Sequence, residues 1–201
     1  MDNGLSVFYI LRNEQDYVGK SMQRIKGVAD EIIAIDCCSI DKTVEICKGF
    51  GAKIYRYKWD DDFSSIRNFA ISKCTKKWIM FVNADELIDG EGVEVINKLV
   101  KQSSTKYAYS FKIKDVVEGW DFSSNHLDPP YSASPQIRLF PNKPSIKFYG
   151  KANESVDKSV HSDGGMIVEE VGVSLVHHLF RGQKGNKETQ EGYYRKISGV
   201  K

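Results

Sequence analysis

Short apolar runs and amphipathic stretches follow one another regularly through the first half of the chain. Residues 5–11 and 31–35 are apolar runs rich in β-branched and aromatic side chains, as buried strands are, and apolar positions between 18 and 28 recur at helical spacing. Further strands are predicted at 53–57 and 78–82, and further helices through 44–47, 64–73 and 91–101. This alternation predicts a parallel sheet with right-handed crossovers, and hence an α/β fold.

The pattern changes after residue 101, where strands and loops dominate. Strand-like segments at 107–117, 136–140 and 167–177 are expected to extend the sheet as a mixed one. Residues 118–135 contain three prolines and little periodicity, which is typical of a long loop that closes over a site. With 201 residues, the chain is predicted to form one domain.

The composition is that of an ordinary globular domain and argues against several classes of function. The 29 Lys and Arg against 27 Asp and Glu leave a net charge of +2 with the signs interspersed, which disfavours nucleic acid or an anionic membrane as the main partner. No stretch approaches the roughly 20 apolar residues of a membrane span, and the N-terminus lacks a signal-peptide pattern, so we expect a cytoplasmic protein. The four cysteines form no C-x-x-C pair and are interpreted as reduced thiols that serve packing.

Polar residues gather where the predicted strands end, at 12–14, at Asp36 and at 83–86. In an open α/β sheet, ligands bind beyond the carboxyl ends of the strands, so these residues are expected to be neighbours in space. The sequence has neither a glycine-rich dinucleotide motif nor a P-loop motif, so a bound phosphate would need a metal instead. Asp85 and Glu86 offer oxygen ligands that suit Mg²⁺ or Mn²⁺, although an exposed acidic turn is an equally simple interpretation.

Ordered motifs stand at the predicted strand ends and helix starts, at 11–14, 29–36, 39–46, 51–55, 59–70 and 78–86. The first four together resemble the nucleotide-binding half of the family 2 glycosyltransferases. The last two resemble the branch of that family that includes lipopolysaccharide-core, flagellin and peptide glycosyltransferases. The resemblance is strong over residues 5–87, and weaker landmarks follow at 136–140, 150–154 and 176–178.

The resemblance implies a GT-A fold, a nucleoside diphosphate sugar, usually a UDP sugar, and a divalent cation, Mn²⁺ or Mg²⁺, held by a D-x-D motif. That motif reads Asn83-Ala84-Asp85 in this chain. Asp85 therefore corresponds to the metal ligand, and it is predicted to act in catalysis together with Glu154. Because Asn83 brings no charge where relatives commonly have an acid, we expect weaker metal binding than with two acids.

Donor-binding residues carry over by position from the resemblance. They are Leu11, Asn13, Glu14, Asp36, Arg67, Asn83, Ala84, Asp85 and Arg138. Arg67 corresponds to the basic residue beside the diphosphate, with a helix-surface salt bridge as the alternative. Arg138 is expected to orient a phosphate or the acceptor, with an edge-strand charge as the alternative. Cys37 and Cys38 stand where relatives often carry an acid or small residues, so the nucleotide base stays open.

The resemblance also points to residues for the reaction and for the metal. Inverting transfer needs a carboxylate that takes the acceptor's proton, and Glu154 stands at a family landmark that often ends in His-Glu. Glu86 and Asp115 are other possible carboxylates, and a solvated loop glutamate is the plain alternative for Glu154. His177 or His178 corresponds to a late histidine that approaches the metal or the diphosphate, with a half-buried polar residue at a strand end as the alternative.

We therefore expect a metal-dependent glycosyltransferase with a nucleotide-sugar-binding half at 1–100 and an acceptor-binding half at 101–201. It would move a hexosyl or N-acetylhexosaminyl group from a UDP sugar, with inversion, to an acceptor hydroxyl on a protein, such as a flagellin Ser or Thr, or on a glycan such as a lipopolysaccharide core. A nucleotide-sugar-binding module with little turnover and a nucleotidyltransferase are the alternatives. In a third alternative the protein continues beyond Lys201. The sequence leaves the donor sugar and the oligomeric state open.

Overall fold

The computed structural model describes residues 2–116, 132–151 and 153–178. Strands and helices alternate in the first half. They are β1 (Asp2–Leu11), α1 (Val18–Ile25), β2 (Glu31–Asp36), α2 (Thr43–Gly49), β3 (Lys53–Arg56), α3 (Phe63–Ile71) and β4 (Lys76–Phe81). The second half is richer in strands. It contains β5 (Glu86–Ile88), α4 (Gly92–Gln102), β6 (Tyr107–Val116), β7 (Ser132–Pro141), α5 (Asp157–Ser162) and β8 (Met166–His178).

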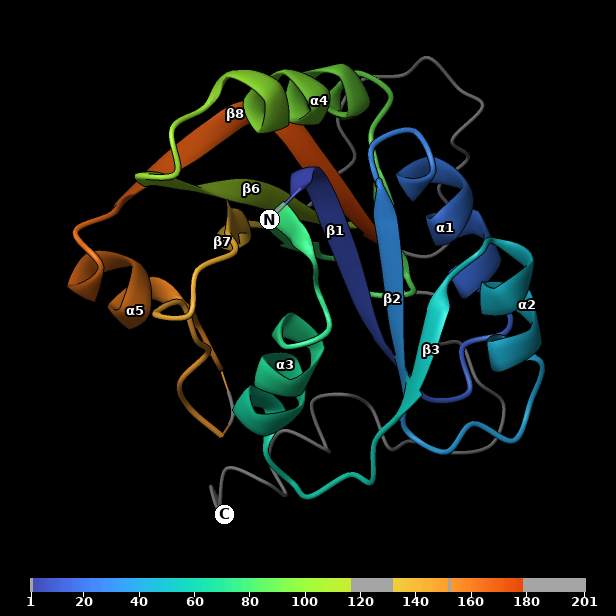
Figure 1. Cartoon of the computed structure of the whole chain (residues 1–201). Helices are drawn as coiled ribbons and strands as arrows, with labels where there is room; N and C mark the ends of the chain where they lie inside the picture. The colour runs from blue at the N-terminus through green and yellow to red at the C-terminus, as the bar shows by residue number, and fades with distance from the viewer. Residues whose placement is uncertain (1, 117–131, 152, 179–201) are drawn as a thin grey trace.

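The described strands form one eight-stranded mixed sheet in the order β3-β2-β1-β4-β7-β6-β8-β5. Strands β1 to β4 are parallel, whereas β7 runs antiparallel between β4 and β6. Because parallel strands end at the same edge, the chain leaves β1, β2 and β4 on one side of the molecule (Figure 1). Leu11 and Asp36 are register neighbours at this edge. The predicted α/β class with a mixed sheet is confirmed.

Helices cover both faces of the sheet and divide the core into two apolar layers (Figure 1). Helices α1, α2 and α4 pack over one face through residues such as Met22, Cys47 and Ile96. Helices α3 and α5 pack over the other face through residues such as Ile66 and Val160. Strand β1 is buried on both faces, which is why its sequence is a continuous apolar run rather than an alternating one.

The predicted elements are present, with two additions and one change. Strand β5 and helix α5 were not predicted, because three and six residues are too short to show a periodicity. Helix α3 begins at Phe63, where the carboxylate of Asp62 accepts a hydrogen bond from the Ser65 N–H at 3.1 Å. Strand β7 begins at Ser132, so the end of the loop predicted at 118–135 is strand, and residues 118–131 lie outside the described part of the chain.

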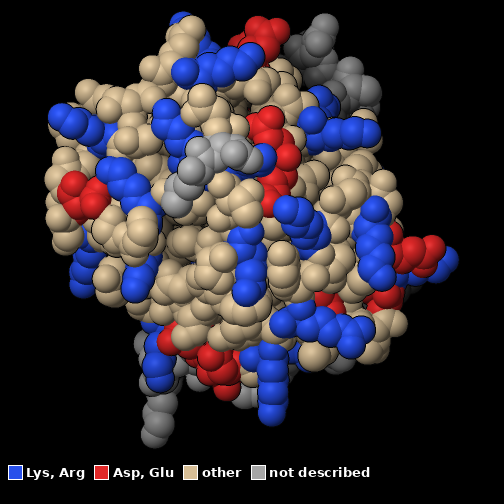
Figure 2. Space-filling model, in the orientation of Figure 1, with Lys and Arg blue, Asp and Glu red and all other residues tan. Residues whose placement is uncertain are grey.

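Three of the four cysteines lie in the core. Cys37, Cys47 and Cys74 are buried, and burial raises the pKa of each thiol to about 12, so all three serve packing as expected. Cys38 is exposed. Basic and acidic side chains are interspersed on the face shown in Figure 2. Within the described ranges, no helix is long and apolar enough to cross a membrane.

Candidate active site

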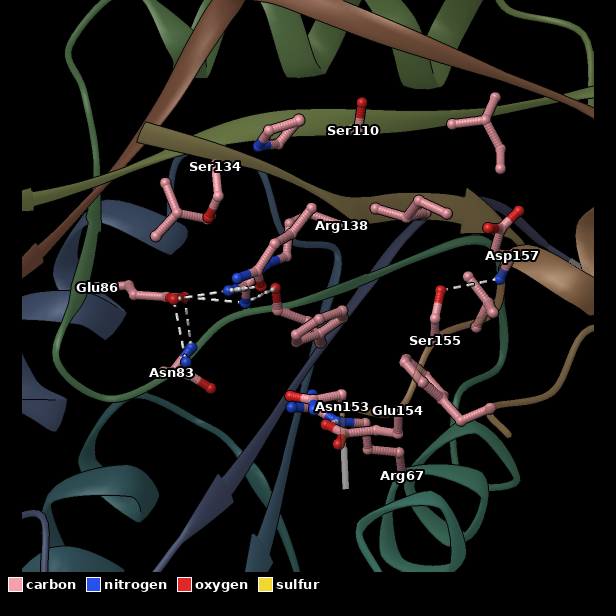
Figure 3. Close-up of a pocket in the computed structure, with 18 of the residues that line it drawn as sticks. Arg67, Asn83, Glu86, Ser110, Ser134, Arg138, Asn153, Glu154, Ser155 and Asp157 are labelled. Carbon is pink, nitrogen blue, oxygen red and sulfur yellow. Dashed lines mark hydrogen bonds and ion pairs between the residues drawn. The ribbon is translucent and has the colours of Figure 1, made fainter. Parts of the chain in front are cut away.

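A cavity of about 670 Å³ opens at the end of β4, where β7, α3 and residues 153–157 also meet (Figure 3). Five of the predicted site residues line it. They are Arg67, Asn83, Arg138, Glu154 and His177. These side chains come from segments far apart in the sequence, so the fold assembles them.

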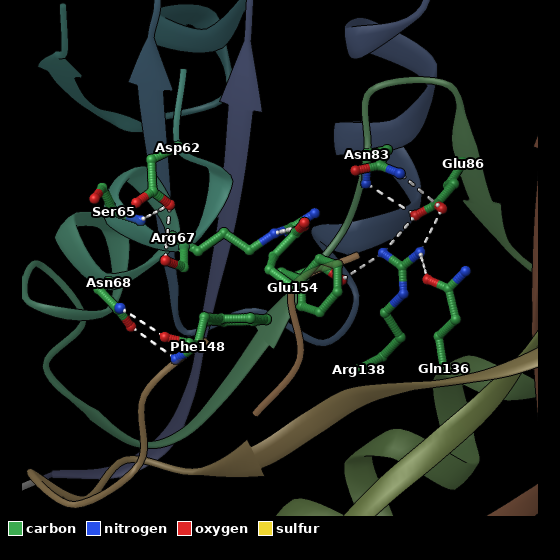
Figure 4. Close-up of polar contacts among 12 residues, drawn as sticks. Asp62, Ser65, Arg67, Asn68, Asn83, Glu86, Gln136, Arg138, Phe148 and Glu154 are labelled. Carbon is green, nitrogen blue, oxygen red and sulfur yellow. Dashed lines mark hydrogen bonds and ion pairs between the residues drawn. The ribbon is translucent and has the colours of Figure 1, made fainter. Parts of the chain in front are cut away.

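Arg138 and Glu86 form a buried ion pair on one wall of the cavity (Figure 4). The Nη2 group of Arg138 donates to Oε1 of Glu86 at 2.7 Å, and Nη1 donates to Oε2 at 3.0 Å. The backbone N–H and the side-chain amide of Asn83 donate to the same carboxylate at 2.9 and 3.0 Å. Each oxygen of Glu86 therefore accepts two hydrogen bonds, which fills the usual capacity of a carboxylate. Glu86 is thus ruled out as the carboxylate that takes a substrate proton.

The same contacts give a local reason for the amide at position 83. Asn83 supplies an N–H group to Glu86, whereas an aspartate there would place a second negative charge against a buried carboxylate. Asn83 is consequently a hydrogen-bond partner of the Glu86–Arg138 pair in addition to occupying the first position of the predicted motif. Arg138 lies on β7, an interior strand, so the edge-strand interpretation of this arginine is wrong.

Arg67 and Glu154 form a second ion pair, which uses a single hydrogen bond. The Nε–H of Arg67 donates to Oε1 of Glu154 at 2.5 Å, and the two side chains are only 10% and 5% exposed. Oε2 of Glu154 is also buried and has no hydrogen-bond partner within the described residues. The surface salt bridge for Arg67 and the solvated loop glutamate for Glu154 are therefore both wrong. Asn153, just before Glu154, has φ +56°, a conformation that asparagine adopts more readily than most residues.

Phe81, the last residue of β4, contacts both arginines. The guanidinium carbons of Arg67 and Arg138 each lie 4.1 Å from the centroid of its ring. A cation this close to an aromatic ring is attracted by the negative charge of the ring face. The strand end therefore supports both ion pairs at once.

Helix α3 is fastened to the segment that carries Glu154. The side-chain amide of Asn68 donates to the Phe148 carbonyl at 3.0 Å, and the Phe148 N–H donates back to the Asn68 side-chain oxygen at 2.8 Å (Figure 4). The N–H of Phe63 adds a hydrogen bond to the Lys151 carbonyl at 3.2 Å. These bonds hold the backbone on the approach to Glu154 against a rigid helix.

Asp85 contacts His177, which lines the cavity. Nε2 of His177 lies 3.2 Å from Oδ2 of Asp85, and the side chains are 17% and 9% exposed. This spacing is a hydrogen-bond distance, and it is also close to the roughly 3 Å that separates two ligands placed at right angles around an octahedral ion about 2.1 Å from each. The carboxylate of Asp85 is of the kind that suits Mn²⁺ or Mg²⁺, whereas the imidazole of His177 is a poor ligand for Mg²⁺. The described residues contain no group of three or more His, Cys, Asp or Glu side chains at this point. Ala84 is buried in the core below, and the side chain of His178 lies outside the described part.

The residues predicted near the nucleoside lie at the adjacent ends of β1 and β2, outside the cavity lining. Leu11 and Asp36 are neighbours, and the carboxylate of Asp36 accepts a hydrogen bond from the Ser39 N–H at 3.0 Å. The Asn13 N–H donates to the Ser39 hydroxyl at 3.0 Å, and the Glu14 carbonyl accepts the first hydrogen bonds of α1. The two loops are thus joined into one rim.

Sequence reasoning gave no role to three residues that support the two ion pairs. Phe81 lies in an apolar run and looks like any core residue, whereas Asn68 is adjacent to Arg67 in the motif at 59–70 and could have been noticed there. Gln136, which accepts a hydrogen bond from Nη2 of Arg138 at 3.0 Å, begins the landmark at 136–140 and could have been noticed in the same way. The side chain of Asp115, an alternative carboxylate, lies outside the described residues.

The fold is that of known GT-A glycosyltransferases. The crystal structure of S. aureus TarS residues 1–349 in complex with UDP-GlcNAc superposes with a TM-score of 0.62 at 16% sequence identity, over 99% of this chain and 66% of that one. At this identity the likeness establishes the fold alone.

The family follows from the sequence. The model of the family described as glycosyl transferase family 2 matches residues 6–160, so the chain belongs to that family. It is 33% identical to the glycosyltransferase SunS of Bacillus subtilis, over 76% of this chain and 35% of SunS. It is 32% identical to a TPR repeat-containing protein of Synechococcus elongatus, over 78% of this chain and 36% of that protein. The chain thus spans about a third of these two relatives.

Proposed function

We propose that this chain binds a UDP sugar and transfers the sugar to an acceptor hydroxyl with inversion. Family membership supports glycosyl transfer, and the UDP-GlcNAc in the TarS crystals supports a UDP sugar as the donor class. One observation carries the proposal. One cavity is lined both by Glu154, whose buried Oε2 has no partner in the described chain, and by His177, which contacts Asp85.

Glu154 is the proposed general base. In inverting transfer the acceptor oxygen forms a bond to the anomeric carbon while the bond from that carbon to the UDP oxygen breaks, and the acceptor proton passes to Oε2 of Glu154. UDP leaves with the bonding electron pair. The Arg67 hydrogen bond occupies Oε1, and Oε2 is buried without a partner in the described chain, so Oε2 is the oxygen left to take a proton once Glu154 turns towards the cavity that it lines. The carboxylate of Glu86 could accept a proton in the same way, but each of its oxygens already accepts two hydrogen bonds.

The leaving diphosphate is proposed to lie in the part of the cavity between Arg67 and the Asp85–His177 contact. Asp85 and His177 would hold Mn²⁺ or Mg²⁺, which when bound neutralises charge on the departing diphosphate. The rim formed by Leu11, Asn13 and Asp36 is the proposed nucleoside contact. The acceptor is a protein side chain or a glycan, and the wall of β7 next to Glu154 is its proposed position.

A thermal-shift panel tests the donor class. UDP, GDP and CMP are each added with and without Mn²⁺ to the parent chain and to Asp85→Ala, because a ligand that binds only the folded state raises the unfolding midpoint. We expect a Mn²⁺-dependent shift with UDP that Asp85→Ala loses. No shift with saturating UDP would contradict the UDP donor, and a shift with another nucleotide would redirect the search.

Turnover separates an enzyme from a binding module. UDP release is followed with UDP-glucose, UDP-galactose and their N-acetylamino counterparts, in the presence of peptide or glycan acceptors. Release of UDP supports transfer and also distinguishes it from nucleotidyl transfer, which would release pyrophosphate. Binding of UDP without any release would support the binding module instead.

A further inference from the structure

Arg67 uses only one edge of its guanidinium group. Its Nε–H is bonded to Glu154, whereas its two terminal Nη groups make no hydrogen bond within the described residues. Yet the side chain is nine-tenths buried, lines the cavity and lies against the rings of Phe81 and Phe148. The Nη groups are not among the buried side-chain atoms that lack a partner, so they are open to the cavity that Arg67 lines. Donors of a charged group that reach a cavity without a protein partner in the described residues have the properties of a binding position.

The ligand that suits this cationic position is an anion. Two parallel N–H groups of a guanidinium match the two oxygens of a phosphate or carboxylate, and such bonds are among the strongest hydrogen bonds in proteins. Arg138, which lies over the same phenylalanine ring, is paired with Glu86. Within the described residues, the carboxylate paired with Arg67 is that of Glu154, through a single hydrogen bond.

We propose that Glu154 and the diphosphate of the donor share Arg67, and that the two anions therefore oppose each other. This inference rests on the proposed function, because it takes Glu154 as the base and a nucleoside diphosphate as the ligand. A diphosphate on the Nη groups draws positive charge away from Glu154 and loosens its carboxylate. The base is then released towards the acceptor when the donor is bound. Linkage is reciprocal, so removing the charge of Glu154 must strengthen binding of the diphosphate.

The test is the affinity of the full chain for UDP, measured by titration calorimetry in Mg²⁺ buffer. Glu154→Gln keeps the shape of the side chain and removes its charge. We expect this variant to bind UDP about fivefold or more tightly than the parent, the low end of typical couplings between sites. Glu154→Ala should change affinity in the same direction. In an Arg67→Met background, Glu154→Gln should change the affinity by less than about twofold, because the shared cation is gone.

Asp163→Asn is the matched control. Asp163 is a carboxylate paired with Lys143 outside the cavity, so this variant removes the same charge at a distance. We expect its UDP affinity to equal that of the parent. Equal or weaker UDP binding by Glu154→Gln would overturn the inference, as would the same gain in Asp163→Asn or a gain that persists without Arg67. If the parent itself binds no UDP, the proposed function fails and this inference with it.

Discussion

Arg138 and Glu86 meet through two hydrogen bonds, whereas Arg67 and Glu154, against the same phenylalanine ring, meet through one. The carboxylate of Glu86 is filled by its neighbours, and that of Glu154 keeps one buried oxygen without a partner in the described chain. Buried ion pairs are costly to desolvate, and further hydrogen bonds are what offset that cost. The pair with the filled carboxylate, called the filled pair, is therefore suited to holding the strand ends, and the pair whose carboxylate has an open oxygen, called the half-filled pair, to holding a ligand.

The largest expected loss of stability follows from removing the carboxylate of the filled pair. Glu86→Ala leaves Arg138 buried without its counter-charge, and we expect a loss of about 3–5 kcal/mol in the free energy of unfolding, measured by urea denaturation. Glu154→Ala removes one hydrogen bond where Glu86→Ala removes four, and it leaves Arg67 beside the cavity, so it should lose less, about 2 kcal/mol. Equal losses in the two variants would contradict the distinction between the pairs.

A smaller effect is expected from the residue that anchors the half-filled pair. Asn68→Ala removes both hydrogen bonds to Phe148 and lets the segment before Glu154 move, so we expect kcat to fall about tenfold or more with little change in KM for the donor. Asn142→Ala is the control. Asn142 also bonds two backbone groups, the carbonyls of Cys74 and Lys76, but lies outside the cavity lining.

Asn68→Ala and Asn142→Ala should each lose about 1–2 kcal/mol in the free energy of unfolding, since each variant loses two side-chain hydrogen bonds. Only Asn68→Ala should lose turnover, and Asn68→Gln should restore part of it if the amide itself matters. Equal losses of kcat in Asn68→Ala and Asn142→Ala would mean that Asn68 supports the fold and nothing more.

The smallest effect on catalysis is expected from Glu31, another buried carboxylate, which lies outside the cavity lining. Burial raises the pKa of Glu31, but hydrogen bonds from Lys53, Ser6 and Thr75 outweigh it and lower the pKa from 4.5 to about 2. A lowered pKa in the folded state stabilises the protein above pH 4.5, and this stabilisation is lost as the pH falls from about 4.5 towards 2.

The unfolding midpoint of the parent and of Glu31→Gln, followed from pH 7 to pH 3, checks this prediction. The parent should be the more stable at pH 7, and the difference should shrink as the pH falls below about 4.5. A difference that stays constant over that range would show that the charge of Glu31 contributes nothing and that Glu31 is not a filled carboxylate of the Glu86 kind.

Much of the fold followed from the sequence because β1, β2 and most of β4 are buried and read as apolar runs. The strand ends could also be predicted, since polar residues follow each run at Asn13, Asp36 and Asn83. The pairing of the charged side chains could not be predicted. Glu86 and Arg138 are 52 residues apart, and Arg67 and Glu154 are 87 apart, so no local pattern links them. The assignment of Asp85 and His177 to a metal stays a prediction.

The most direct measurement is the rate of UDP release by Glu154→Gln against the parent, with a donor and acceptor on which the parent turns over. A general base contributes about 100- to 10,000-fold, so we expect kcat to fall by at least about 100-fold while UDP still binds. A Glu154→Gln variant that turns over at close to the parental rate would contradict the role of Glu154 as the base.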